Sequence, residues 1–257
     1  ALEVAIGGAP DQNIAQMQAG KVDLVMTGGV PLVAAVANGL PLVASLNIQN
    51  QEATPTMGLV VPADSPIKTV ADFKGKSIGL PGIASPQGLA VLLMLEKYGI
   101  AKDDVKLVNL PFDGMLDSAK NGAVDAIVPI GLFYALALDT GYREFPEAYQ
   151  FLQQTPAVIY ASTKAWADAN ADTLKAFNAA MQEAYDYANK NPDEVRRIDK
   201  EQTRLPPAFI EKRFIPPFTA AFNTKRWDEM NKDLARFGFI GRTPAPEEYI
   251  WSGAPTK

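Results

Sequence analysis

Short apolar runs alternate with amphipathic segments over the first two-thirds of the chain, and this alternation is the pattern of an α/β fold. Apolar runs bounded by turn residues predict strands, whereas apolar positions three and four apart predict helices. The first third is expected to contain strands at 2–6, 21–26, 42–48 and 57–62 and helices at 11–19 and 31–38. Gly20 and Gly39 follow the two helices, where glycine is a common C-terminal stop.

The middle of the chain repeats this order of elements. We expect strands at 77–80, 105–110 and 123–128, helices at 86–98 and 113–120, and a further helix that ends near Gly141. From Pro156 the pattern changes, because one more strand at 157–162 is followed by segments that are nearly all helical. No linker rich in Gly, Ser or Pro divides the chain, so two lobes would have to be joined by strands that cross between them.

Two stretches resemble each other. Residues 18–25 and 120–127 both run from a helix through Gly and Val-Asp into an apolar strand. This echo has two interpretations that the sequence leaves open: Gly and Asp are common in any helix-to-strand connection, or the chain contains two α/β lobes of similar build.

Three loops share one design, in which a strand ends, a turn with Gly or Pro follows, and a helix begins. They are residues 27–30, 81–87 and 129–133. The carboxyl ends of parallel strands are the usual place for ligands in open α/β sheets, and the N–H groups at a helix start favour an anion. Each loop alone is more often a simple helix cap, so Ser85 before Pro86 is first interpreted as a cap. The three together favour a binding site.

The side chains of these loops also indicate the character of a ligand. None of the loops contains Lys or Arg, which a strongly held phosphate would usually require. Apolar and aromatic residues accompany them, namely Ile83, Ile130, Leu132, Phe133 and Tyr134. We therefore prefer an organic anion with an apolar or aromatic body, although Phe133 and Tyr134 are equally compatible with ordinary packing.

Composition removes much common enzymology. The 257 residues are 47% hydrophobic and 21% charged, which is enough apolar material for a sizeable core. The sequence has no Cys and no His, so thiol nucleophiles, disulfides, zinc–thiolate sites and imidazole catalysis are excluded within it. A net charge of −5 argues against a nucleic-acid partner. No apolar run approaches the roughly 20 residues that cross a bilayer, and no signal-peptide pattern opens the sequence.

Other motifs carry no chemistry. The stretch 79–82 lacks dinucleotide-loop spacing, there is no P-loop, and Asp103 with Asp104 is typical of a helix boundary. The aromatic residues Trp227, Phe237, Phe239 and Trp251 are interpreted as packing of C-terminal helices. We therefore expect no catalytic residues, no metal ligands and no cofactor.

At this point the residues resemble a known family, the periplasmic substrate-binding proteins of nitrate, sulfonate and taurine ABC importers, which also contains proteins similar to thiamine-precursor binders. The clearest stretch is VADFKGKSIG at 70–79, which is similar to the family's entry into its second lobe. Looser likenesses follow in order at 92–99, 105–111, 119–127, 159–166 and 177–192.

This resemblance implies a type II periplasmic-binding-protein (Venus flytrap) fold, with two lobes that each contain a mostly parallel sheet flanked by helices. Lobe I would comprise 1–61 and 158–257, without the family's first strand and helix, and lobe II would comprise 62–157. The ligand would lie in the cleft between the lobes. Carried over by position, the ligand-binding residues would be Thr27, Gly28, Gly29, Val30, Ile83, Ala84, Ser85, Gln87, Pro129, Ile130 and Phe133.

The implied function is capture of a small organic anion by a monomeric, periplasmic or lipid-anchored protein, followed by delivery to an ABC permease. Many sulfonate binders of the family carry a Trp where this chain has Val128-Pro129, so sulfonate specificity is not implied. Two alternatives remain open: an enzyme on the same fold, such as a lyase or a pyrimidine-precursor synthase, and a ligand-sensing module of a signalling receptor. The fungal synthase branch needs a histidine and a Cys-rich motif, which this chain lacks.

Overall fold

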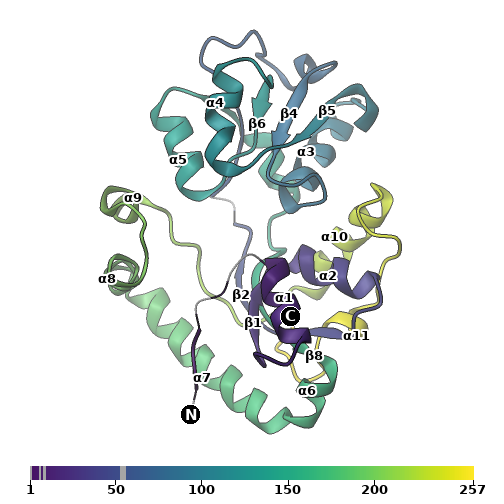
Figure 1. The fold of residues 1–257 in the computed structure, drawn as a ribbon, viewed down its shortest axis with the longest axis vertical. Helices are drawn as coiled ribbons and strands as arrows, with labels where there is room; N and C mark the ends of the chain where they lie inside the picture. The colour runs from purple at the N-terminus through teal and green to yellow at the C-terminus, as the bar shows by residue number, and fades with distance from the viewer. Residues whose placement is uncertain (1, 6, 8–9, 53–55) are drawn as a thin grey trace. The chain divides into compact units, whose positions relative to one another are not determined.

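The computed structural model describes residues 2–5, 7, 10–52 and 56–257, which divide into two compact units (Figure 1). Unit 1 contains Ala1–Gln51, Gln154–Val195 and Ile215–Lys257, and unit 2 contains Glu52–Gln153 and Arg196–Phe214. The sequence predicted that lobe I contains 1–61 and 158–257. The structure places 52–61 in unit 2, because the strand at 59–61 pairs within the unit 2 sheet, and groups 196–214 with that unit as well.

Unit 1 combines one sheet with several helices. Its strands are β1 (Val25–Thr27), β2 (Leu42–Asn50) and β8 (Pro156–Thr163), and its helices include α1 (Pro10–Gln18), α2 (Gly29–Ala37), α6 (Lys164–Ala169), α7 (Ala171–Lys190), α10 (Thr224–Arg236) and α11 (Pro246–Tyr249). Helix α8 (Pro192–Gln202) begins in unit 1 and continues into unit 2, where α9 (Pro207–Lys212) follows. Residues 2–5 are not in a strand, contrary to the expectation for 2–6, and residue 6 lies outside the described part of the chain.

The sheet of unit 1 corrects the expectation of a mostly parallel sheet. Its order is β1-β8-β2, and β8 pairs antiparallel with both neighbours. Strands β1 and β2, which α2 connects, therefore run in the same direction, as the alternating pattern predicts. Strand β8, more than a hundred residues later in the chain, returns in the opposite direction and inserts between them. Local periodicity contains no information about such an insertion.

Helix α7 packs against this sheet as its spacing predicts. Leu174 is buried, and the rings of Tyr160 on β8 and Phe177 on α7 meet edge to face at 5.1 Å. The Nδ2 of the buried Asn178 donates to Ser45 O of β2 at 2.9 Å, whereas its Oδ1 has no hydrogen-bond partner. The helix therefore covers the sheet with apolar contacts and one buried polar anchor.

Unit 2 has a mixed sheet of order β5-β4-β6-β3-β7. Its elements are β3 (Leu59–Val61), β4 (Ser77–Leu80), α3 (Pro86–Lys97), β5 (Lys106–Asn109), α4 (Met115–Lys120), β6 (Ala126–Ile127), α5 (Gly131–Asp139) and β7 (Arg143–Phe145). Strand β4 pairs in parallel with β5 and β6, whereas β3 is antiparallel to β6 and β7. The mixed α/β class is thus confirmed, and parallel pairing is limited to β4, β5 and β6.

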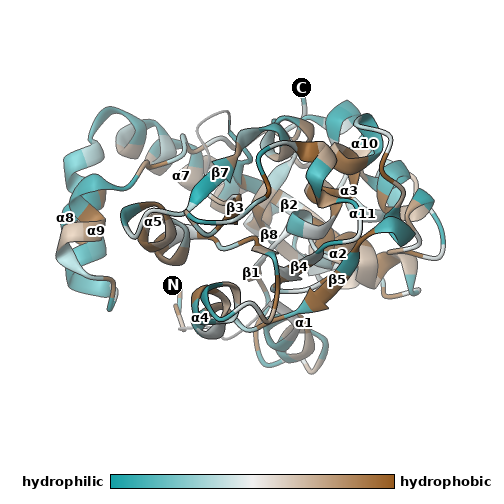
Figure 2. Ribbon diagram, turned by 90° about the horizontal axis from the view of Figure 1, so that it is seen from above, coloured by the Kyte–Doolittle hydropathy of each residue, from teal (hydrophilic) through white to brown (hydrophobic). Residues whose placement is uncertain are grey.

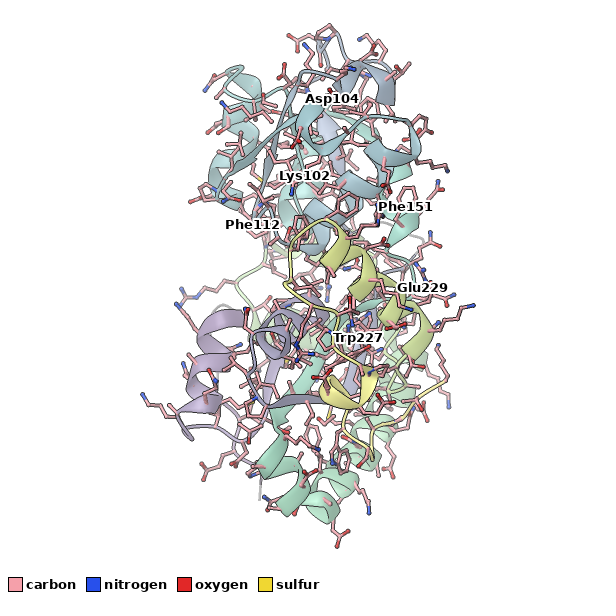
Figure 3. The ribbon with its side chains drawn as sticks, turned by 90° about the vertical axis from the view of Figure 1, so that its right-hand side faces the viewer. Lys102, Asp104, Phe112, Phe151, Trp227 and Glu229 are labelled. Carbon is pink, nitrogen blue, oxygen red and sulfur yellow. The ribbon has the colours of Figure 1, made fainter. Side chains whose placement is uncertain are left out.

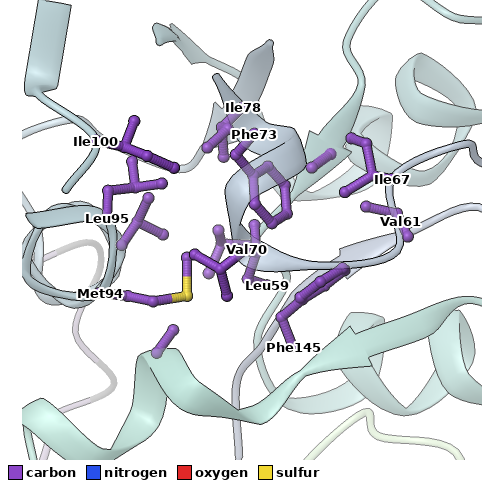
Figure 4. Close-up of a cluster of buried hydrophobic side chains, with 14 of the residues drawn as sticks. Leu59, Val61, Ile67, Val70, Phe73, Ile78, Met94, Leu95, Ile100 and Phe145 are labelled. Carbon is purple, nitrogen blue, oxygen red and sulfur yellow. The ribbon is translucent and has the colours of Figure 1, made fainter. Parts of the chain in front are cut away.

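A compact apolar core holds unit 2 together (Figure 4). Phe73 has no exposed surface and meets the ring of Phe145 edge to face at 4.9 Å. Met94 and Leu95 of α3 complete one side of this core. Helix α5 is apolar around most of its circumference, as its colour in Figure 2 shows, and Leu136 and Leu138 remain exposed on it. Among the described residues, no helix combines the length and apolar character needed to span a bilayer.

A partly buried series of hydrogen bonds begins on α5 with Tyr134. The Tyr134 hydroxyl donates to Glu144 Oε2, and the Tyr149 hydroxyl donates to the Tyr134 hydroxyl at 3.2 Å. Burial and the Glu144 carboxylate raise the pKa of Tyr134, so both phenols stay protonated at neutral pH. Gly58 lies against this pair, and a Cβ at that position would overlap Tyr149 Oη. The packing of Tyr134 and Tyr149 therefore requires glycine at position 58.

The substitution Gly58→Ala is therefore expected to destabilise the protein by about 1–3 kcal/mol, the usual cost of overpacking a core. Gly114→Ala in the same unit is the matched control, because its Cβ would meet Pro111 Cγ at an ordinary 3.7 Å. Urea unfolding followed by circular dichroism measures both. Equal midpoints for the two variants would contradict the packing role assigned to Gly58.

Candidate ligand-binding site

The sheet of unit 2 brings several loops to one edge. In the parallel pairs, Gly79 of β4 lies opposite Val108 of β5 and Ile127 of β6. The segments that follow these strands, at 81–85, 110–112 and 128–130, therefore leave the sheet at the same edge. Two of the three predicted loops are thus brought together, and the segment after β5, which was not predicted to belong to the site, joins them.

The loop after β4 is built as a helix cap. The Ser85 hydroxyl accepts from Gly88 N at 3.1 Å and donates to Gly82 O, so its capacity is used within the loop. Gly88 is required there because a Cβ would overlap Ile83 O. The first interpretation of Ser85, as an N-cap followed by Pro86, is confirmed. Ile83 and Gln87 are half-buried and Ala84 is exposed.

Asn109 fixes this loop from the neighbouring strand. Its Oδ1 accepts from Ile83 N at 3.0 Å, although the two residues are 26 positions apart in the chain. Asn109 is the last residue of β5 and is itself exposed. The amide therefore holds the shape of the edge while its Nδ2 end stays on the surface.

The loop after β6 is held by backbone contacts. Gly58 N donates to Pro129 O at 3.1 Å, and Gly131 N donates to Thr56 O at 2.7 Å. Ile130 occupies the N-cap of α5 and has no polar side chain to offer the helix. Phe133 is half-buried, whereas Tyr134 is turned inward to the hydrogen-bond chain described above. Of the two aromatic residues left open by the sequence, Tyr134 is a packing residue.

In unit 1 the loop after β1 leads into α2 without a side-chain cap. Thr27 ends the strand, and Gly28 takes the N-cap position with φ −94° and ψ 158°, the extended geometry of a capping residue. Val30 is buried, and Gly29 is pressed against the start of β8, where a Cβ would lie 2.9 Å from Pro156 O. The first N–H groups of α2 thus receive no side-chain acceptor from Gly28.

Two polar atoms near this loop have no partner. Thr27 Oγ1 and Trp227 Nε1 are both buried without a hydrogen bond. The Trp227 indole, labelled in Figure 3, comes from α10, and its Nε1 lies 3.5 Å from the Cβ position of Gly29. Trp227 was predicted to pack among the C-terminal helices, and its contacts with Phe222 and Tyr249 confirm that. Its place beneath Gly29 was not predictable from the spacing.

The two edges differ in chemistry. The unit 1 edge offers hydrogen-bond donors, and the unit 2 edge is mostly apolar, with Ile83, Ile130, Phe112 and Phe133. The loops 27–30, 81–87 and 129–133 contain no ionisable side chain. Within the described ranges, no group of three His, Cys, Asp or Glu side chains is placed to hold a metal ion. The arrangement can bind a polar or anionic group through N–H and O–H donors, and it has no acid–base pair in these loops.

The sequence also matches a known protein family. A family model described as NMT1/THI5 like matches residues 1–195 of the chain. The chain belongs to the NMT1/THI5-like family. The family assignment agrees with the resemblance seen in the sequence, although the C-terminal 62 residues, which include Trp227, lie beyond the matched range.

Individual relatives of this NMT1/THI5-like chain carry two kinds of name. A Haemophilus influenzae protein with a provisional name in thiamine biosynthesis is 28% identical over 244 residues, which cover 89% of this chain and 74% of the relative. An Escherichia coli protein with a provisional name as an aliphatic sulfonates-binding protein is 27% identical over 196 residues. That match covers 76% of this chain and 57% of the relative.

Solved structures show the same fold. The periplasmic aliphatic sulphonate-binding protein SsuA from Escherichia coli superposes with a TM-score of 0.82 at 21% identity, covering 97% of this chain and 82% of that one. The alkanesulfonate-binding SsuA from Xanthomonas axonopodis, solved with MOPS bound, gives 0.78 at 21% identity, with 95% and 85% covered. The expected periplasmic-binding-protein fold is thereby confirmed.

Because the Ser85 hydroxyl is used as a cap, Ser85→Ala is expected to lower the free energy of unfolding by about 1 kcal/mol. Ser85→Asp should recover most of that loss, since a carboxylate also accepts from the first turn of a helix and suits its dipole. Chemical denaturation of the three proteins side by side is the measurement. A Ser85→Asp variant as unstable as Ser85→Ala would show that capping of α3 is not the role of this side chain.

Proposed function

We propose that this protein is an extracytoplasmic solute-binding protein that captures a small organic anion and delivers it to an ABC permease. The anion classes in view are sulfonates, nitrate- or taurine-like anions and aromatic carboxylates. Within unit 1, Thr27–Val30 would supply hydrogen-bond donors to an anion. Within unit 2, the carboxyl edge of the sheet would offer apolar contacts to an organic group. The names of the sulfonate-binding relative and of the two SsuA structures support this class of ligand.

The observation that carries the proposal is the uncapped start of α2. A helix N-terminus presents free N–H groups and a partial positive charge, and both favour an anion. Ser, Thr, Asp and Asn are the preferred N-cap residues because their side chains accept from these groups, whereas α2 has Gly28 at the position, directly after Thr27 with its unpartnered Oγ1. Glycine also lets a ligand approach the backbone closely.

An enzyme on the same fold is the second candidate, and one observation favours it. The relative from Haemophilus influenzae carries a provisional name in thiamine biosynthesis. Against catalysis, the candidate loops hold no ionisable side chain and the chain has no histidine or cysteine. We therefore place capture without chemical change first and a synthase- or lyase-like activity second. A sensor module that hands the ligand to a signalling receptor would bind it in the same way.

A thermal-shift screen of this chain against sulfonates, nitrate, aromatic carboxylates and pyrimidines tests the proposed function. One-site binding stabilises a protein by RT ln(1 + [L]/Kd), about 2.7 kcal/mol at a hundredfold excess over Kd. For a chain of this size that corresponds to roughly 5 °C or more in Tm. An anion that gives such a shift and is recovered unchanged supports the solute-binding role. Conversion of the bound compound would favour the enzyme, and shifts given only by cationic amines would refute the anion class.

Gly28→Asp tests the position of the anion. The backbone of Gly28 already has N-cap geometry, so an Asp carboxylate there would accept a hydrogen bond from the Val30 N–H and repel a second anion; the next residue, Pro31, has no N–H. We expect at least tenfold weaker anion binding, measured by calorimetry, with the fold retained. Gly28→Asn is the matched control, because both side chains meet the same contact 3.2 Å from Pro31 Cδ but only Asp is charged. Unchanged anion affinity in both variants would show that the anion does not bind at the start of α2.

A further inference from the structure

Two phenyl rings lie parallel at the carboxyl edge of unit 2. Phe112 opens the short 3-10 helix Phe112–Gly114 after β5, and Phe133 lies in the first turn of α5 after β6. Their ring centroids are 6.1 Å apart and their planes differ by 8°. The two residues come from different loops, and the parallel pairing of β5, β4 and β6 brings those loops to one edge. Figure 3 labels Phe112 in unit 2.

This pair differs from the aromatic contacts that build the core of unit 2. Phe73 with Phe145, and Tyr134 with Tyr149, meet edge to face and are buried. Phe112 and Phe133 are both half-buried, and neither belongs to the apolar cluster of Figure 4. The edge pair therefore leaves aromatic surface at the place where an α/β sheet binds its ligands, instead of closing a core.

The surroundings of the pair suit a flat organic group. Ile83 and Ile130 lie on the loops that leave the same edge, and both are half-buried. Asn109 holds the Ile83 backbone through its Oδ1 at 3.0 Å, which leaves its amide nitrogen as a polar group at the border. The loops at 81–87 and 129–133 contain no Lys or Arg, so they attract the body of a ligand and not its charge.

From this geometry we infer that Phe112 and Phe133 form an aromatic platform that makes the site select anions with a planar aromatic body over aliphatic anions of the same head group. The inference rests on the proposed function and narrows its ligand class. Phe112 is the specificity-determining residue that this inference adds to Phe133, which was predicted from the sequence.

Calorimetric titration of the full chain with matched anions tests the inference. Benzenesulfonate is compared with ethanesulfonate, and benzoate with acetate, so that each pair shares a head group. We expect the aromatic member to bind at least fivefold more tightly, because ring stacking adds to simple area burial. Phe112→Leu and Phe133→Leu keep an apolar side chain but remove the ring face, and each should reduce that ratio about threefold or more while changing the aliphatic affinity little.

Phe151→Leu is the matched control in the same unit, because Phe151 packs against the core and under Lys97. It should leave the aromatic-to-aliphatic ratio unchanged, and circular dichroism confirms that each variant is folded. Aliphatic and aromatic anions binding equally well, or ratios that survive both ring substitutions, would overturn the platform while leaving the solute-binding role intact. Failure of every anion to bind would instead overturn the proposed function and the platform with it.

Discussion

The parallel pairing of β4 with β5 and β6 is the constraint on which the unit 2 edge depends. One side-chain bridge anchors it: Asp125 Oδ2 accepts from Ser77 N at 2.8 Å and from Ser77 Oγ at 2.7 Å, and Asp125 N donates back to Ser77 Oγ at 3.0 Å. This ties the start of β4 to the start of β6 and so fixes their register. Burial opposes the charge on Asp125, but the bonds from Ser77 and the nearby Lys76 outweigh it and hold its pKa below the usual value. The bridge is therefore intact at neutral pH and weakens only in acid, where this carboxylate becomes protonated.

The same bridge shows that the similar stretches 18–25 and 120–127 have different roles in the structure. The two stretches share Gly and Val-Asp, yet their aspartates differ in the structure: Asp125 connects two strands, whereas Asp23 is exposed. The surrounding sheets differ as well, because β6 lies between parallel and antiparallel neighbours and β1 pairs antiparallel with β8. The two similar stretches therefore lead into strands with different pairing. For these aspartates, the common preference of helix-to-strand turns for Gly and Asp is the better interpretation.

Much of the fold was predictable because its signals are local. Apolar runs located β2, β4 and β5, glycine marked the end of α2 and proline the start of α3, whereas α2 begins at Gly29, two residues before the predicted start at 31. The insertion of β8 between β1 and β2 depends on residues about a hundred positions apart, so periodicity could not predict it. The pairing of β3 with β7 involves strands of only three residues, which are too short to give a periodic signal. The candidate site follows the same division. Ser85 was recognisable as a cap from Ser-Pro alone, whereas Asn109 and Phe112 join the edge only through strand pairing, and Trp227 reaches Gly29 from a helix near the end of the chain.

The three loops share one sequence pattern, but the helices that follow them differ in how their first N–H groups are hydrogen-bonded. Helix α3 satisfies its own start with Ser85, and α5 has its first N–H taken by Thr56 O, but α2 has only Gly28 at its N-cap. A buried, unsatisfied donor costs a folded protein free energy, so a chain tolerates one where something else supplies the acceptor. Thr27, whose Oγ1 has no partner, immediately precedes the N-cap Gly28 of α2. An anion arriving there would satisfy donors that the fold leaves open, whereas at α3 it would have to displace a cap that is already made. This difference, and not the shared loop pattern, distinguishes the start of α2 from the starts of α3 and α5.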